Sequence, residues 1–196
     1  ALANGEITFV CTRRGDLGRV SHKAFGLFFL LSMQNAVLRR PGNENSRIPH
    51  FLYIDEFPDF ICKDTEAIFT MYRKYKIGTM VSAQSLTQLD LSSQKENYKV
   101  AILSNCANKI YTGGATIEEL NWWSDEFGTH REWVYSNSMD MDKMKYDSKY
   151  GGVKWDFVKY FKPGKLQTMA AKDCAYKIRG SNGKPVVGPA RLNYLE

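Results

Sequence analysis

The sequence is poor in the side chains that build metal centres and disulfide frameworks. Its 196 residues include three histidines and four cysteines, and no two cysteines stand in a CxxC arrangement. Structural zinc sites and disulfide-stapled domains need such residues at close, paired spacings. We therefore expect no zinc centre, and we interpret the cysteines as small buried hydrophobic residues in a reducing compartment.

Long hydrophobic runs are also missing. The longest apolar stretch, residues 25–31 (FGLFFLL), is much shorter than the roughly 20 residues that a membrane-spanning helix needs. The chain starts at Ala1 rather than at a methionine. We expect it to be a soluble piece excised from a longer protein, in which a membrane anchor could lie elsewhere.

A third absence concerns phosphate binding. The phosphate-binding loop, or Walker A motif, reads GxxxxGK[ST], and its lysine reaches the phosphates. Residues 13–19 (RRGDLGR) have neither that spacing nor the lysine, and in residues 180–185 (GSNGKP) a proline follows the lysine. Because the motif is missing, we expect the chain by itself not to hydrolyse ATP.

The composition that is present indicates a globular protein. Hydrophobic residues make up 43% of the chain and charged residues 24%, which suffices for a packed core. The formal net charge is +6. A basic balance of this kind favours a polyanionic partner such as nucleic acid.

The most informative stretch is residues 51–57 (FLYIDEF), in which an apolar run leads into Asp55 and Glu56. Such a run predicts a short buried strand, and a second predicted strand, residues 79–83 (TMVSA), ends at Gln84. Ligands of open α/β sheets bind beyond the carboxyl ends of the strands. There, an acid can hold a metal ion, a second acid can polarise water, and a glutamine can sense a phosphate. The alternative is solvated polar residues at ordinary turns.

The remaining patterns alternate between strands and helices over the first 128 residues and then change. We predict strands at residues 7–12 and 109–112, and helices at residues 21–39, 65–75, 95–106 and 116–127. Residues 129–196 form a second part: a long polar surface loop at 136–152, a β-hairpin from 166–171 and 175–179, and an irregular tail from residue 185.

Three stretches together resemble the C-terminal part of the motor domain of type IV secretion coupling proteins, the TraG/TraD-like conjugation ATPases. They are LYIDEF (52–57), YRKYKIGTMVSAQSLTQL (72–89) and LSNCANKIYTGGATIEELNWWSDEFG (103–128). The resemblance implies an α/β fold: a partial RecA-like P-loop NTPase domain without its Walker A segment, with a mostly parallel sheet flanked by helices. A C-terminal β-hairpin extension, within residues 129–196, would pack on the same domain.

The resemblance also implies roles and cofactors. Asp55 would be the Walker B acid that holds Mg²⁺, Glu56 the catalytic carboxylate, and Gln84 the sensor of bound ATP. Arg73 would be an arginine finger that acts in a neighbouring subunit. The alternative for Arg73 is a cation that complements a helix dipole together with Lys74 and Lys76.

The implied function is ATP-driven transfer of DNA through a type IV secretion system. The partners would be DNA, most simply single-stranded, relaxase or relaxosome proteins, and channel components, with a homo-hexamer at the cytoplasmic face of the bacterial inner membrane. Lys95, Lys99 and residues 143–149 are candidates for contacts with DNA. Two alternatives remain open: the assembly ATPase of the same secretion systems, and a non-catalytic interaction domain on this fold.

Overall fold

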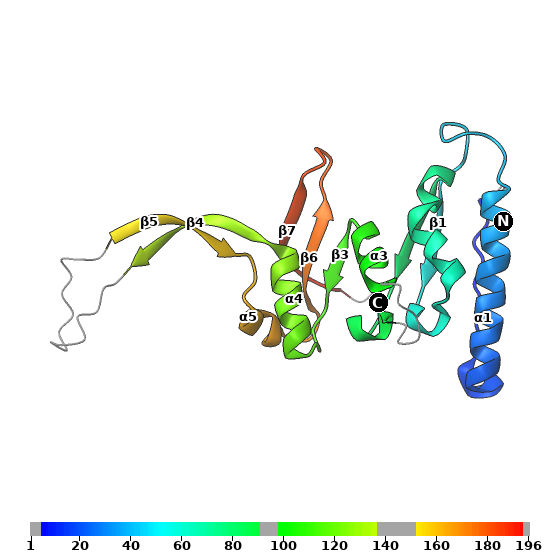
Figure 1. The fold of residues 1–196 in the computed structure, drawn as a ribbon, viewed down its shortest axis with the longest axis horizontal. Helices are drawn as coiled ribbons and strands as arrows, with labels where there is room; N and C mark the ends of the chain where they lie inside the picture. The colour runs from blue at the N-terminus through cyan, green and yellow to red at the C-terminus, as the bar shows by residue number, and fades with distance from the viewer. Residues whose placement is uncertain (1–4, 91–97, 137–151, 194–196) are drawn as a thin grey trace. The chain divides into compact units, whose positions relative to one another are not determined.

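A computed structural model describes residues 5–90, 98–136 and 152–193 (Figure 1). The chain forms two compact units, Ala1–Ala107 and Asn108–Glu196. Residues 108–128, which we had grouped with the first part, therefore fold with the second unit. The division at residue 128 into a part of the RecA-like domain and an extension packed on it stays a prediction.

The first unit is built around two parallel strands. β1 (His50–Ile54) pairs with β2 (Ile77–Val81) from His50 opposite Ile77 to Ile54 opposite Val81. The long helix α1 (Arg14–Leu38) precedes them, with a kink at Gly18, and α3 (Tyr98–Asn105) follows. Short helical segments complete the unit: η1 (Phe57–Phe60), η2 (Lys63–Glu66), α2 (Ala67–Thr70), η3 (Tyr72–Tyr75) and η4 (Leu86–Leu89).

Two predictions for this unit were wrong in detail. The continuous helix predicted at residues 65–75 is three short segments, because β-branched and aromatic residues favour helix weakly and Ile68 and Tyr72 are fixed by burial. The strand predicted at residues 7–12 does not form, since no described strand pairs with it. Its Ile7 and Phe9 are 84% and 93% exposed.

The side chains of β1 alternate between a buried and an exposed face. Leu52 and Ile54 are buried, as are Phe57 and Phe60 of η1. Helix α1 lies close to η1 at Gly26, where a Cβ atom would stand 2.2 Å from the Phe60 ring. This close approach anchors the segment that directly follows Asp55 and Glu56.

The second unit contains a three-stranded antiparallel sheet and a separate ribbon. The sheet has the order β3 (Lys109–Tyr111), β6 (Asp173–Arg179), β7 (Pro185–Arg191). Strands β4 (Thr129–Ser136) and β5 (Gly152–Lys159) form the two-stranded ribbon. Helices α4 (Ile117–Phe127) and α5 (Pro163–Gln167) cover a hydrophobic core.

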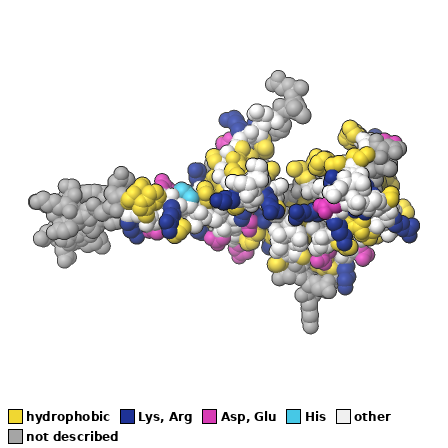
Figure 2. All heavy atoms as spheres, turned by 90° about the horizontal axis from the view of Figure 1, so that it is seen from above, with side chains coloured by type: hydrophobic (Ala, Val, Ile, Leu, Met, Phe, Trp, Pro, Cys, Tyr) yellow, Lys and Arg dark blue, Asp and Glu magenta, His cyan; other side chains and the backbone are white. Residues whose placement is uncertain are grey.

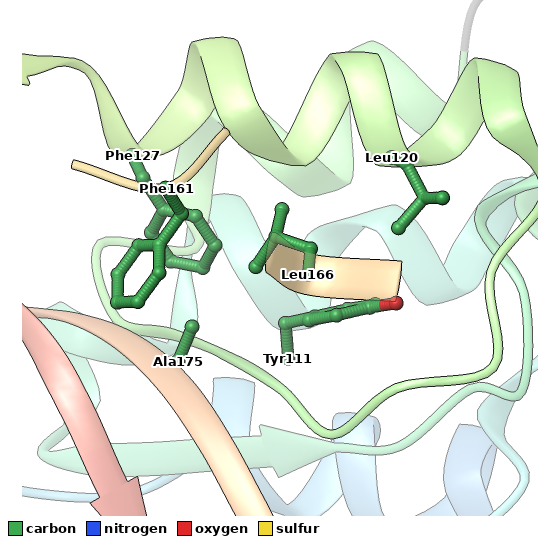
Figure 3. Packing of buried hydrophobic residues seen from close by; sticks show 6 residues of the cluster. All are labelled: Tyr111, Leu120, Phe127, Phe161, Leu166 and Ala175. Carbon is green, nitrogen blue, oxygen red and sulfur yellow. The ribbon is translucent and has the colours of Figure 1, made fainter. Parts of the chain in front are cut away.

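Figure 3 shows this core, in which Leu120 and Phe127 of α4 point toward Tyr111 and Leu166. Helix α4 starts as predicted, with a capping box between Thr116 and Glu119 that satisfies two backbone amides at its N-terminus.

The C-terminal predictions need correction. Residues 166–171 are not a strand: Pro163 starts the short helix α5 there, as proline does at a first helical turn. The hairpin instead joins β6 to β7, so the predicted irregular tail is mostly strand. Gly183, with φ at 78°, lies in the turn. Most of the predicted 136–152 loop lies outside the described residues, but paired strands flank it.

The four cysteines are free, and Cys174 alone among them is buried, whereas Cys11 is exposed on the unpaired segment before α1. The expectation that the cysteines are buried therefore holds for Cys174 alone, since Cys62 and Cys106 are only partly buried and Cys11 is exposed. In the described part of the chain, no helix is long and apolar enough to cross a membrane.

A cluster of charges ties α1 to η1 in the first unit. Lys23 Nζ lies 2.9 Å from Asp59 Oδ1, and Arg14 Nη1 and His22 Nε2 lie 3.4 and 3.6 Å from Oδ2. The hydrogen bond from Lys23 lowers the pKa of Asp59, and the nearby positive charges act in the same direction against the effect of burial. Asp59 thus fixes the segment behind the acids.

We predict that Asp59→Asn destabilises the chain by about 1–2 kcal/mol at neutral pH, through loss of a charge-assisted hydrogen bond. The lowered pKa means that the contribution of Asp59 is present above the unfolded value of about 3.9. It is lost as the pH falls through the folded pKa. Thermal unfolding followed between neutral and acid pH measures this, with the exposed Asp64→Asn as control. Equal effects of both variants would contradict the prediction.

Candidate active site

The predicted site residues gather at the carboxyl ends of β1 and β2. Ile54 and Val81 are the last paired residues, so Asp55 and Ser82 come next on their strands. The ladder continues past them: Ser82 N donates to Ile54 O and Phe57 N donates to Ser82 O, both at 3.0 Å. The backbone around the acids is therefore fixed by the sheet.

Ser82 holds the carboxylate of Asp55. Its Oγ donates to Asp55 Oδ1 at 2.5 Å, and the Glu56 amide donates to that same oxygen and to Ser82 Oγ, each at 3.0 Å. Both bonds to Asp55 end on Oδ1, and within residues 5–90, 98–136 and 152–193 no hydrogen bond reaches Oδ2, which leaves that oxygen for a ligand. The carboxylate is thus oriented from one side and open on the other.

Glu56 adopts the left-handed backbone conformation, with φ 47° and ψ 47°. This conformation is uncommon for a residue other than glycine and is concentrated at functional sites. Gln84 Nε2 donates to Glu56 Oε1 at 3.1 Å, and the backbone N–H of Gln84 donates to Gln88 Oε1 at 3.2 Å. Asp55, Glu56 and Gln84 therefore lie together: Ser82 links Asp55 to the Glu56 backbone, and Gln84 contacts the Glu56 side chain.

A cavity of about 310 Å³ adjoins the acids. Its lining includes both of them, along with Thr12, His22 and Phe60. The acids thus border a space that the described residues leave unfilled.

Arg73 does not join this group within the chain. It is exposed on η3, just before the first residue of β2, whereas Ser82 and Gln84 follow the last one. Five strand residues at roughly 3.3 Å each separate the two edges. The helix-dipole alternative is weak here, because η3 is a four-residue 3₁₀ turn rather than a full helix.

Ser82 is the site residue that the sequence analysis missed. It stands one position past β2, as Asp55 stands one position past β1, so the parallel register was the signal that could have found it. Among the candidate DNA contacts, Lys99 lies 3.5 Å from Asp90. Lys95 and residues 143–149 lie outside the described residues.

The donor set fits Mg²⁺ better than zinc. The described residues contain no group of three or more histidine, cysteine or acidic side chains that could hold a metal ion. Mg²⁺ is commonly held by one or two carboxylates together with nucleotide phosphates and water. One oriented carboxylate with a free oxygen, as at Asp55, meets that requirement.

Residues 49–158 match the family model described as the TraM recognition site of TraD and TraG. The match covers more than half of the sequence and includes Asp55, Glu56 and Gln84. The chain belongs to this family, and the resemblance to TraG/TraD-like coupling proteins is confirmed. A search of curated proteins found no significant match.

Solved structures share the fold. The bacterial conjugative coupling protein TrwBdeltaN70 in an unbound form matches with a TM-score of 0.68 at 14% identity, over 86% of this chain and 36% of that one. The plasmid coupling protein TrwB in complex with ADP and Mg²⁺ matches with a TM-score of 0.66 at 14% identity, over 93% and 38%. The expected partial RecA-like α/β fold is confirmed, and the chain spans little more than a third of these proteins.

Proposed function

We propose that the chain is the C-terminal part of the motor domain of a conjugative coupling ATPase, which moves DNA or a relaxase–DNA complex through a type IV secretion system. The observation that carries the proposal is the hydrogen-bonded group of Asp55, Ser82, Glu56 and Gln84 at the carboxyl edge of a parallel strand pair. Parallel α/β sheets bind nucleotides at this edge.

Each member of the group has a role in ATP hydrolysis. Asp55, oriented by Ser82, would hold Mg²⁺ through its open oxygen, and the ion would neutralise charge on the phosphates. Glu56 would accept a hydrogen bond from the attacking water and take up its proton. Gln84 contacts Glu56 directly, so it would couple the position of that carboxylate to the bound nucleotide.

The incomplete sheet supports the view that other parts of a longer protein finish the site. On the face of the strand pair opposite to Leu52 and Ile54, Phe51, Tyr53 and Met80 are 62%, 69% and 57% exposed. Parallel sheets are ordinarily covered on both faces. The missing phosphate loop would come from outside this sequence, so the chain alone would not hydrolyse ATP.

The assembly follows from the same proposal. The partners would be single-stranded DNA, relaxase or relaxosome proteins and the secretion channel, around a homo-hexamer at the cytoplasmic face of the inner membrane. The net charge of +6 suits a DNA partner, and the family name refers to recognition of TraM. Stimulation of ATP hydrolysis by added single-stranded DNA would separate this function from that of a pilus-assembly ATPase.

In the complete protein, we predict that Glu56→Gln retains ATP binding within about twofold and lowers hydrolysis roughly 10²- to 10⁴-fold, as expected for loss of a general base. The amide keeps an acceptor for Gln84, so the local structure should persist. Fluorescent-nucleotide binding and steady-state phosphate release measure the two effects.

The matched control is Glu44→Gln, which changes an exposed glutamate in the α1–β1 loop and should leave both values unaltered. Unchanged turnover in Glu56→Gln would refute the catalytic role of Glu56.

The proposed role of Arg73 in a neighbouring subunit can be tested by mixing variant subunits. We predict that Arg73→Ala lowers turnover by roughly 10³- to 10⁵-fold, the usual effect of losing an arginine finger. Mixing it with Glu56→Gln subunits should restore part of the activity, because a mixed interface can combine an intact Glu56 with an intact Arg73.

Lys74→Ala removes a neighbouring exposed cation of η3 and serves as control, with little expected change. Inactive mixtures, or equal losses for the two cations, would contradict a role for Arg73 in trans.

A further inference from the structure

The β4–β5 ribbon presents a distinctive face. It pairs with no other described strand, and Figure 1 shows it extending beyond α4 and α5 of its own unit. Arg131 lies opposite Phe157 and Trp133 opposite Trp155. Because side chains alternate along a strand, these four residues share one face. We call Arg131, Trp133, Trp155 and Phe157 the aromatic face.

The two indoles of the aromatic face contact each other, Arg131 contacts the Phe157 ring, and all three rings remain open to solvent. The Trp133 and Trp155 ring centroids lie 4.3 Å apart, and the Arg131 guanidinium lies 5.0 Å from the centre of the Phe157 ring. Yet Trp133, Trp155 and Phe157 are 51%, 56% and 63% exposed. Stabilisation of the hairpin explains the contact between the indoles. It does not explain three large rings left in water.

The charges of the ribbon are sorted between its faces. Glu132 and Asp156 oppose each other on the other face. There, Glu132 lies 3.3 Å from His130 Nε2 and Asp156 lies 3.0 Å from Lys154 Nζ. The aromatic face as defined carries a cation and no acid. In Figure 2 the ribbon shows hydrophobic side chains with both basic and acidic ones beside them.

We propose that the aromatic face binds single-stranded nucleic acid, with bases stacked on Trp133, Trp155 and Phe157 and with Arg131 beside the phosphates. Proteins that bind single strands combine exposed rings with cations, because every base offers a face for stacking. The separation of both carboxylates onto the opposite face removes repulsion from the phosphates. A duplex would supply the phosphates but not free base faces.

This inference rests on the proposed function, which names single-stranded DNA as a partner, and it assigns that partner to a surface outside the nucleotide site. The test is binding of the purified 196-residue chain to a fluorescein-labelled oligothymidine, by anisotropy at fixed low salt without ATP. We expect Trp133→Val/Trp155→Val to raise Kd roughly tenfold or more, the usual scale for loss of base stacking. Valine preserves the preference for strand.

A pair of charge variants distinguishes the two faces. Arg131→Gln should raise Kd about fivefold, whereas Lys154→Gln, which removes the same charge from the opposite face, should change it less than about twofold. Equal losses in the two variants would indicate general electrostatic attraction and would overturn the proposal.

Other results would overturn it too. One is that the unaltered chain does not bind oligothymidine, and another is that it binds a duplex equally tightly. A third is that the tryptophan double variant changes self-association in sedimentation but not the affinity for oligothymidine. Amide hydrogen exchange of β4 checks that the ribbon persists. If amide protection shows that the ribbon unfolds in the double variant, the test moves to Phe157→Val, which keeps the indole pair. This variant must then bind oligothymidine more weakly than the unaltered chain. None of these outcomes bears on the Glu56 prediction.

Discussion

The parallel pairing of β1 with β2 is the interaction on which the candidate site depends. Its register ends both strands at one edge, so that the residue after Ile54 meets the residue after Val81. Asp55 and Ser82 are thereby brought into hydrogen-bond contact although 27 positions separate them. The same pairing lets Gln84 reach Glu56. A shift of one residue would exchange the exposed and buried faces of a strand and would separate Asp55 and Glu56 from Ser82 and Gln84.

The second unit is organised by a shared carboxylate. Lys109 Nζ of β3 and Lys177 Nζ of β6 both lie 2.9 Å from Glu126 Oε1, near the end of α4. Burial raises the pKa of Glu126, but the hydrogen bonds and charges of the two lysines outweigh it and hold the pKa below its ordinary value. Lys159 adds an ion pair with Asp125 at 2.8 Å. The base of the β4–β5 ribbon is therefore fixed to α4 and, through Glu126, to the sheet.

The sequence was most informative where the signal is local. An apolar run followed by two acids located Asp55 and Glu56, and the Thr116–Glu119 capping box located the start of α4. It was least informative where pairing joins distant segments. Strand β7 contains a glycine and two prolines, so its pairing with β6 is not visible in its own residues. Residues 7–12 show the converse, since a strand-like composition forms no strand without a partner.

The backbone of Glu56 connects the fold to the proposed chemistry. A left-handed conformation in a residue with a side chain costs roughly 1–2 kcal/mol, and glycine would avoid that cost. Glycine would also lack the carboxylate that Gln84 contacts. In this conformation the Glu56 amide donates to both Asp55 Oδ1 and Ser82 Oγ, and η1 starts immediately afterwards at Phe57, with Pro58 in its first turn. The sheet thus holds Glu56, the residue that would take up the proton, in an unfavourable backbone conformation. A glutamate at this position supplies both the fixed backbone amide and the carboxylate.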